Sequence, residues 1–379
     1  MPQINQVFEI VNSVAGQALG TQAITAVDTQ SLVTLGNQVL SSNTNKESFL
    51  NTLVDRIGKT IISSRSYRSK FDFMLKDDMQ YGAILQKINF DMPDTEEDPS
   101  WNLTNDQSID QYKIKKPKVR QSLFTKESAW MISQTFTRKQ LKTAFTSAGA
   151  MDQFIQGVYT AIQNKIEFNF EQLGRATLAN YIAEVVETPR VINLLDAYNK
   201  AHGLNAGQAL KAVNAKFDPE FLRFAIKEIN KYSKLFTELT KGEFNDGTTP
   251  RHTPKDKQTC LISLDWEGAF ETQMQYSAYN DGYVKLKNYD TVSYWQSIKK
   301  PESIDVSKRS SDGTAKTLDG IVGTLFDVEA MGIFKHDLHA ETSPYNAKGE
   351  YYNTYWHALD MRFNDLSENM VVFTVADVA

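Results

Sequence analysis

The chain has 379 residues and a formal net charge of −5, from 41 Lys and Arg against 46 Asp and Glu. This length allows two or three domains or one large elaborated domain. The mild negative charge excludes non-specific electrostatic binding of nucleic acid, which needs a basic surface. The single cysteine, Cys260, excludes a disulfide framework and a multi-thiolate metal cluster. Because Leu261 and Ile262 follow it, we expect a buried structural thiol.

The N-terminal 45 residues contain no Lys or Arg and only two acids, Glu9 and Asp28. Their apolar residues are scattered singly among polar ones, so we expect the segment to bury little surface by itself and to be either flexible or an arm lying on something else. It lacks the basic and apolar regions of a secretory signal, and no stretch of the chain approaches the ~18 apolar residues of a membrane span. The sequence therefore predicts synthesis in the cytosol and no membrane partner.

A first helix is predicted over residues 48–58. Apolar residues recur at 49, 50, 53, 54 and 57, which gives one helical face, with Ser48 as a possible N-cap and Gly58 as the stop.

Residues 66–130 carry an acidic block at 91–98 and a basic block at 113–120, separated by a turn that contains Trp101. This pattern indicates an extended two-stranded arm with opposite charge on its two limbs. Two interpretations stay open: an ordinary solvated hairpin, or pairing with a neighbouring subunit, which would set register and partner choice. The candidate subunit-interface residues are Asp94, Glu96, Glu97, Asp98, Lys113, Lys115, Lys116, Lys118 and Arg120.

The middle of the chain alternates helical and strand patterns. One broad apolar stripe predicts a long helix from Gly149 to Pro189, although Gly157 and Gly174 lower the expectation of a single rod. A second helix is predicted from Asp218 as the cap to Leu239. A buried strand follows at 259–264, with Asp265 as a possible cap for a short helix. Residues 281–335 are expected to alternate short strands with turns.

The C-terminal region has a strong aromatic strand signal at 351–363, a polar break at 364–369 and an apolar run at 370–375. Two such runs separated by a few polar residues predict a β-hairpin that closes a sheet. The order of helices, strand-rich insert and final strands indicates an α+β fold.

No catalytic constellation is found. The chain has no nucleophile elbow, phosphate-binding loop or dinucleotide fingerprint. His336 and His339 form the only histidine cluster, and their spacing is not that of two ligands on one helix. His357 is expected to be a packing residue. We predict that the protein is not an enzyme and has no cofactor or metal site.

Three separated segments carry distinctive motifs. The first is Phe49 to Gly58, with the pattern F-x-x-x-L-V-D-R-I-G. The second is Gln134-Thr135 through Leu141-Lys142-Thr143-Ala144-Phe145, with the pattern Q-T…L-K-T-A-F. The third spans Phe334 to Phe373 and includes Asp337-Leu338-His339 and the aromatic run from Tyr351 to His357. In these three segments the chain resembles the major capsid proteins of small podoviruses related to the Bacillus phage phi29, whereas residues 190–330 match only in the order of their helices and strands.

The resemblance implies a Hong Kong 97 (HK97)-like capsid fold. Its parts would be an N-terminal arm with the first helix (1–65), an E-loop reaching over a neighbour (66–130), a P-domain with the spine helix (131–244), an A-domain (245–335) and returning P-domain strands (336–379). The phi29 protein continues into an immunoglobulin-like domain beyond the matched region, so no outer decoration role is implied.

The implied function is that of a major capsid protein. Many copies would form hexamers and pentamers and then an icosahedral or prolate shell around double-stranded phage DNA, held without sequence-specific contact. The expected partners are the chain itself, a separate scaffolding protein and a portal protein. The expected location is the virion, after assembly in the host bacterial cytoplasm. Two alternatives stay open: the shell of an encapsulin-type compartment, and a metal-dependent hydrolase that uses the His336 and His339 region.

Overall fold

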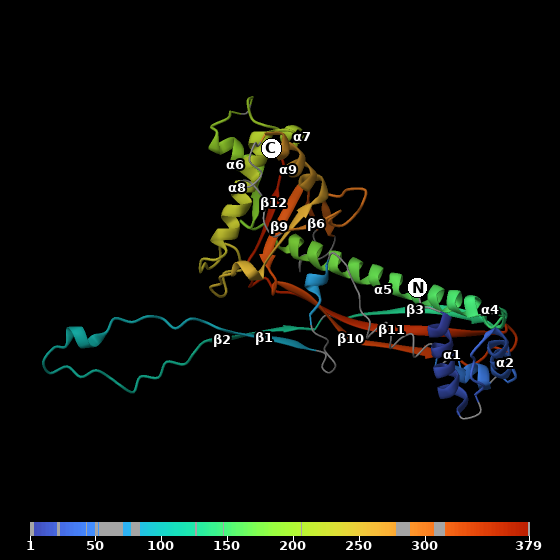
Figure 1. The fold of residues 1–379 in the computed structure, drawn as a ribbon. Coiled ribbons are helices and arrows are strands. Elements are labelled where there is room, and N and C mark those ends of the chain that lie inside the picture. Colours follow the sequence, from blue (N-terminus) through green and yellow to red (C-terminus); the bar gives the residue numbers. More distant parts are fainter. Residues whose placement is uncertain are drawn as a thin grey trace. The chain divides into compact units, whose positions relative to one another are not determined.

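The computed structural model describes residues 4–20, 23–42, 44–49, 52, 71–76, 84–125, 127–146, 148–205, 207–277, 289–306 and 315–377. These residues form two compact units (Figure 1). Unit 1 takes its residues from 1–81, 127–174 and 333–361, and unit 2 takes its residues from 82–126, 175–332 and 362–379. The chain thus passes repeatedly from one unit to the other, and helices and strands are mixed in both, as expected for an α+β fold.

The sheet of unit 1 has the strand order β10-β11-β3. Its strands are β3 (Glu127–Thr137), β10 (Met331–Thr342) and β11 (Tyr351–Asn364). β11 runs antiparallel to β3, from Tyr351 opposite Thr137 to Met361 opposite Glu127. Side chains alternate along β11 because successive strand residues point to opposite faces. Tyr352 and Trp356 are buried, whereas Tyr351 and Tyr355, which point to the other face, are half-buried.

The N-terminal segment forms two helices of unit 1, α1 (Ile4–Leu19) and α2 (Thr29–Leu40). Asp28 caps α2 by accepting a hydrogen bond from the Ser31 backbone N–H at 2.7 Å. One stripe of each helix joins the core that contains Trp356, including Val14, Leu32 and Leu35. The segment does not bury this surface by itself but against other parts of unit 1, which is one of the two outcomes expected from the sequence. Single apolar residues three or four positions apart form a continuous stripe once the chain is helical.

Part of the predicted helix at 48–58 is described. Residues 44–49 and 52 are helical, so the helix begins before Ser48 and Ser48 is not its N-cap. The Phe49 ring packs 5.5 Å from that of Phe145. Residues 50, 51 and 53–58 lie outside the described residues, and so does most of the first motif of the resemblance.

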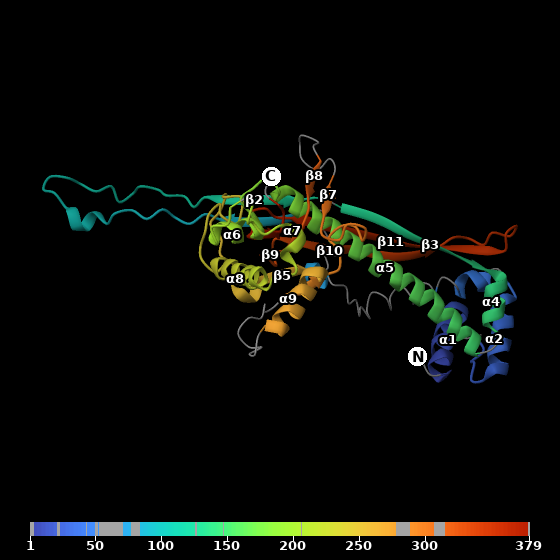
Figure 2. The same ribbon diagram turned by 90° about the horizontal axis from the view of Figure 1, so that it is seen from above.

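The predicted long helix is confirmed as α5 (Ala148–Val185), which follows the short helix α4 (Arg138–Ala144). It has 38 residues and continues through Gly157 and Gly174 as one rod (Figure 2). Gly174 has a packing role, since a Cβ at this position would lie 3.0 Å from Cβ of Phe71. Helix α5 therefore has a glycine at this position because the Phe71 side chain occupies the space that a larger residue would fill.

The sheet of unit 2 has the order β4-β12-β9-β5-β6. Its strands are β4 (Val191–Asn193), β5 (Gln258–Ser263), β6 (Asp290–Val292), β9 (Ile321–Asp327) and β12 (Met370–Thr374). β9 and β12 are buried along their whole length, as is typical of central strands covered on both faces. The predicted strand at 259–264 is confirmed as β5.

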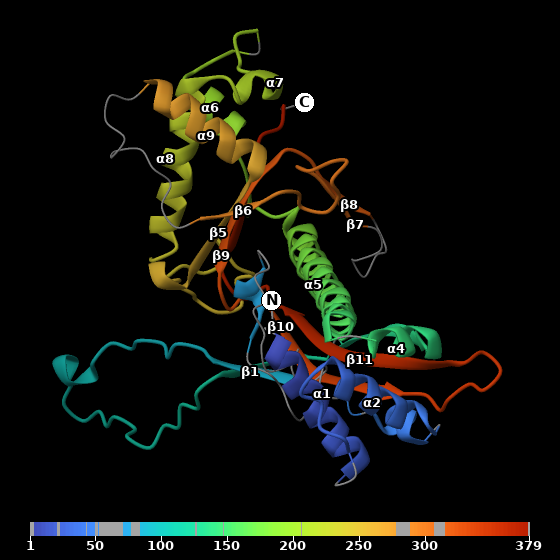
Figure 3. The ribbon, with the colours of Figure 1, turned by 45° about the vertical axis from the view of Figure 1, so that its right-hand side comes forward.

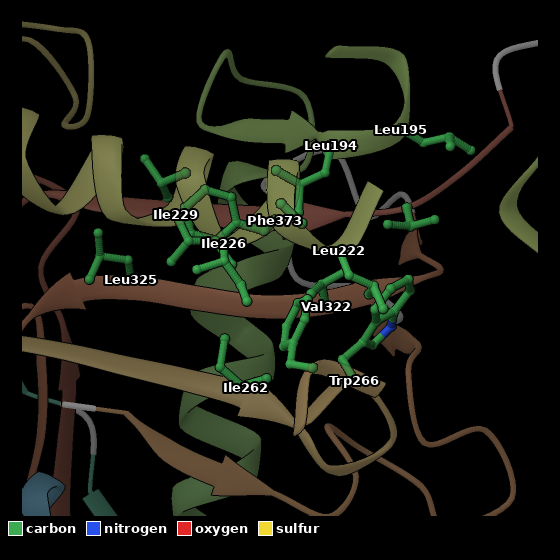
Figure 4. Close-up of a cluster of buried hydrophobic side chains, with 14 of the residues drawn as sticks. Leu194, Leu195, Leu222, Ile226, Ile229, Ile262, Trp266, Val322, Leu325 and Phe373 are labelled. Atoms are coloured by element: carbon green, nitrogen blue, oxygen red, sulfur yellow. The ribbon is translucent and has the colours of Figure 1, made fainter. Parts of the chain in front are cut away.

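Three helices gather around this sheet (Figure 3). They are α6 (Leu194–Ala201), α8 (Pro219–Leu235) and α9 (Leu264–Ser277). Asp218 caps α8 as predicted and accepts hydrogen bonds from the backbone N–H groups of Glu220 and Phe221. Figure 4 shows Leu222, Ile226 and Ile229 of α8 packed with Val322, Leu325 and Phe373 of the sheet.

Several boundaries differ from the sequence analysis. Helix α5 ends at Val185 and not at Pro189, and β5 ends at Ser263. Helix α8 ends at Leu235 and not at Leu239. Asp265 does not cap a helix, because α9 begins one residue earlier, at Leu264, and Asp265 lies in its first turn.

The predicted C-terminal hairpin was wrong. β11 and β12 are both strands, but β11 pairs with β3 and β10, whereas β12 pairs with β4 and β9. The predicted returning segment 336–379 is therefore divided between two sheets. The physical reason is the polar break, in which Asp365, Glu368 and Asn369 are buried. The break is buried within unit 2 and does not form an exposed turn.

The remaining short elements complete the described chain. They are η2 (Asp72–Met74), β1 (Leu85–Phe90), η3 (Pro99–Asn102), β2 (Val119–Phe124), α7 (Ala212–Ala215), η4 (Lys255–Lys257), β7 (Ile304–Val306) and β8 (Lys316–Leu318). β6, β7, β8 and β9 bear out the expected short strands at 281–335. Residues 281–288 and 307–314 of this range lie outside the described part.

Candidate subunit-interface site

The predicted two-stranded arm is a hairpin of unit 2. β1 and β2 are antiparallel, in register from Leu85 opposite Phe124 to Phe90 opposite Val119. The loop between them, residues 91–118, contains the short 3-10 helix η3 and otherwise turns and irregular chain (Figure 1, teal). A hairpin of six pairs is marginal by itself in water, so its position depends on what its faces contact.

The inner face of the hairpin contacts the rest of unit 2 at two points. Lys87 on β1 places its Nζ 2.7 Å from Oδ2 of Asp365 and 2.6 Å from Oε1 of Glu368. The ring of Phe124 on β2 lies 5.3 Å from that of Phe363. Lys87, Asp365 and Glu368 were not recognised in the sequence, because no local pattern links residue 87 to a polar stretch near residue 365.

The outer face of the hairpin is apolar and exposed. It carries Ile88 (51 % exposed), Phe90 (65 %), Val119 (53 %) and Leu123 (56 %). Ile88 and Phe90 lie two residues apart on β1, and Phe90 pairs with Val119 across the strands, so their side chains share one face. The alternation of Ile88 and Phe90 with polar residues was a usable signal for a two-faced strand.

The loop adds further exposed apolar side chains. Trp101, Tyr112 and Ile114 are 86 %, 81 % and 81 % exposed. Half of the large hydrophobic side chains that are exposed in the described part of the chain lie between Ile84 and Leu123. Such a concentration marks an interaction surface.

The acidic and basic blocks contact each other within the hairpin. Lys115 forms an ion pair with Glu96, and Nε of Arg120 lies 3.1 Å from Oδ1 of Asp91. The hydrogen bond from Lys115 lowers the pKa of Glu96, and the charges of Lys115 and Lys113 lower it further. Both side chains of the Lys115–Glu96 pair are more than half exposed, so water screens this attraction strongly.

The other predicted interface residues have local roles or are solvent-exposed. Glu97 accepts a hydrogen bond from the Asn102 side chain at 3.0 Å, and Asp98 caps η3 through the Ser100 backbone N–H at 2.9 Å. The remaining members of the set are exposed, namely Asp94, Lys113, Lys116 and Lys118. Their pairing with a second subunit stays a prediction.

The histidine region of unit 1 forms an open depression of about 450 Å³ on the outer face of the β10-β11-β3 sheet. His339 Nδ1 lies 2.7 Å from Oδ2 of Asp337, and its ring stacks on that of His357 at 5.2 Å. Among the described residues, no three His, Cys, Asp or Glu side chains are grouped as metal ligands. The side chain of His336 lies outside the described part.

Cys260 is buried in β5, as predicted. Burial raises the pKa of its thiol to about 12, so the reactive thiolate form is suppressed at neutral pH. In the part of the chain that the structure describes, no helix combines the length and apolar character needed to cross a bilayer.

Comparison with known proteins identifies the family of this chain. The family model of the Phi29-like phage major capsid protein matches residues 9–374. The chain belongs to this family. As a Phi29-like capsid protein it is similar to the major capsid protein of Bacillus phage GA-1, with 23 % identity over 374 residues that cover 98 % of this chain and 70 % of the relative. It is also similar to that of Bacillus phage PZA, with 20 % identity over 386 residues, covering 99 % and 74 %.

The fold of this capsid protein is also found in a solved structure. The capsid structure of Staphylococcus phage Andhra matches with a TM-score of 0.54 and 11 % identity over 81 % of this chain and 84 % of that chain. The resemblance and the HK97-like fold predicted from the motifs are thereby confirmed. The chain is a structural component of a phage capsid, whose copies assemble with one another. The family match favours neither an encapsulin-type compartment nor a hydrolase.

Proposed function

We propose that copies of this capsid protein form hexamers and pentamers, and that these close into an icosahedral or prolate shell around double-stranded DNA. A separate scaffolding protein and a portal protein would take part in assembly in the host cytoplasm. The shell would hold its DNA without sequence-specific contact, and the chain would have no catalytic role. The net charge of −5 supports the proposed lack of sequence-specific contact with DNA, because a shell built from negatively charged subunits does not retain DNA during filling.

The hairpin is the proposed contact between neighbouring copies in the shell. In this assignment residues 66–130 are the E-loop and α5 is the spine of the P-domain. Strands β5, β6 and β9 of the five-stranded sheet lie in the A-domain segment (245–335), whereas β4 and β12 lie in the segments assigned to the P-domain. The observation that carries the proposal is the two-faced hairpin, whose inner face is attached to its own chain while its outer face is apolar and exposed.

The apolar face would supply most of the affinity. Burying the exposed half of four such side chains contributes on the order of 1 kcal/mol each. Exposed ion pairs such as Lys115–Glu96 contribute little and are screened by salt. The charged blocks, including Asp94, Lys113, Lys116 and Lys118, would therefore set register and partner choice.

Two variants test this division of roles. Ile88→Ser/Phe90→Ser removes the apolar contact, and Lys115→Glu/Lys116→Glu/Lys118→Glu reverses the basic block. We expect the first to abolish shells in negative-stain images and the second to impair their closure, while circular dichroism shows folded subunits in both.

Matched controls make the same changes elsewhere in the described chain. Ile298→Ser removes an apolar side chain that is 78 % exposed, and Lys255→Glu/Lys299→Glu/Lys300→Glu alters the net charge by the same amount as the hairpin reversal. Normal shells from both hairpin variants would overturn the proposal.

A further inference from the structure

The polar break that separates β11 from β12 is an anchor inside unit 2. Asp365, Glu368 and Asn369 are only 4 %, 4 % and 0 % exposed. Polar groups at this depth need partners, since burial without them costs free energy. The carbonyl of Asp365 accepts a hydrogen bond from the Tyr181 hydroxyl at 2.9 Å, and Asn369 donates one to Thr253 at 3.2 Å. The break is therefore held in place from several sides.

Lys87 connects the hairpin to this anchor. Its ammonium bridges Asp365 and Glu368, and Nη2 of Arg251 lies 3.1 Å from Oε1 of Glu368. Two cations thus balance two carboxylates in a site where the carboxylate side chains are 5 % exposed. The ion pairs of Arg120 and Lys115 both stay within the hairpin. Within the described residues, Lys87 is the hairpin residue with polar contacts to the rest of unit 2.

From this geometry we propose that Lys87 is a positioning residue, which fastens the base of the hairpin and so fixes the direction in which loop 91–118 leaves unit 2. The importance of that direction for assembly rests on the proposed function. The attachment itself is a property of the single subunit and can be tested without shells.

The surrounding charges favour an attachment that is permanent over one that switches with pH. Besides Lys87, Arg251, Asp365 and Glu368, the charged and titratable groups that face the cluster are Asp327 at the end of β9, Tyr181 of α5, Arg190 and Asp246. Burial opposes the charge of Lys87, but Asp365 and Glu368 together hold its pKa above the usual value. Burial also opposes ionisation of Asp365, yet Lys87 and Ser367 hold the pKa of this carboxyl below the usual value. Lys87 and Asp365 therefore stay ionised at neutral pH.

The test measures amide hydrogen exchange of β1 and β2 in isolated full-length subunits. A two-stranded hairpin that is held only by the contact of Phe124 with Phe363 opens more readily, so Lys87→Met is expected to speed exchange at residues 85–90 and 119–124 by about tenfold or more. Lys87→Arg keeps the cation and is expected to retain slow exchange. Lys257→Met is the matched control, because Lys257 forms an exposed ion pair with Glu329 at 2.9 Å away from the hairpin.

A double variant separates positioning from charge balance. Lys87→Met/Asp365→Asn leaves Arg251 facing Glu368, so the global unfolding midpoint in urea is expected to return toward that of the wild type. Exchange in the hairpin is expected to stay fast, because the attachment is still missing. Slow hairpin exchange in this double variant, or in Lys87→Met alone, would overturn the proposal.

The two proposals can fail separately. Hydrogen exchange reports on the attachment whether or not shells form. Shell formation with a freely moving hairpin would refute the need for a fixed direction and leave the capsid function intact.

Discussion

Two groups of ion pairs on the same hairpin differ in what surrounds them. At the loop, Lys115 and Glu96 are 55 % and 56 % exposed. At the base, Lys87 is 20 % exposed and its partners Asp365 and Glu368 are 5 % exposed. The chemistry is the same, but the attraction at the base acts with less water around it.

Dense charge in a sequence therefore does not locate the most buried ion pairs of the folded chain. The loop blocks are conspicuous in the sequence but contribute little to the fold, because water competes for each charge. The basal cluster holds fewer charges, yet removing one leaves a buried partner uncompensated. The loop charges are accessible to a neighbouring subunit, whereas the basal charges stabilise the subunit itself.

The largest expected effect comes from Asp365→Ala. This change leaves Lys87 with one carboxylate and removes the acceptor for the Ser367 hydroxyl and backbone N–H. We expect a loss of about 3 kcal/mol in the free energy of unfolding, measured by urea denaturation, because a buried pair is broken from one side. Asp98→Ala, which removes the exposed cap of η3, is the control and should change little. A loss at Asp365→Ala no larger than that of the control would refute the comparison.

A smaller effect is expected from pH. The pKa of Asp365 is held below its usual value of 3.8, so its stabilisation is complete above that value and is lost as pH falls through the lower folded pKa. Lys87 stabilises the fold up to alkaline pH. Its pKa is raised above 10.5, so its stabilisation is complete below 10.5 and is lost only as pH rises through the higher folded pKa. Glu368 opposes Asp365, because burial raises its pKa and its protonation in acid favours the folded state.

The measurement compares the wild type with Asp365→Asn across pH. The difference in unfolding free energy is expected to be constant between about pH 5 and 9 and to shrink below about pH 4. A difference that already falls between about pH 8 and 6 would show that Asp365 is not held ionised in this way.

Much of the fold could be predicted because its signals are local. The stripe of α5, the cap of α8 and the apolar run of β5 each lie within one stretch of sequence. The resemblance also used local motifs, such as the aromatic run of β11. These signals identified the family without identifying how its strands pair.

What failed depends on distant partners. β11 and β12 are close in sequence, but β11 pairs with β3, more than 200 residues earlier, and this pairing rules out a hairpin with β12. The polar break after β11 looked exposed because its partner Lys87 is 281 residues from Glu368. Similarly, the N-terminal helices looked weakly apolar because their stripe is completed only by other parts of unit 1, such as Trp356.

The two-stranded arm was predicted from its charged limbs, and the structure brings Glu96 and Lys115 of the two limbs together. The role of these charges at a subunit interface stays a prediction. The apolar outer face was missed because Ile88 and Phe90 lie on one strand and Val119 and Leu123 on the other. Only the register shows that these four side chains share one face.

The smallest effect on folding is expected from Lys115→Gln/Glu96→Gln, which neutralises the loop pair. Lys115 lowers the pKa of Glu96, but both groups are in water, so subunit unfolding should be unchanged within error at any pH between about 5 and 9. The apolar outer face stays intact, so shells should still form in the double variant. If the blocks set register with a neighbour, the shells should be less uniform in size, and added salt should produce the same defect in the wild type because it screens exposed charges. Uniform shells in high salt would assign the loop charges to solubility alone and leave the outer face of the hairpin as the contact between copies.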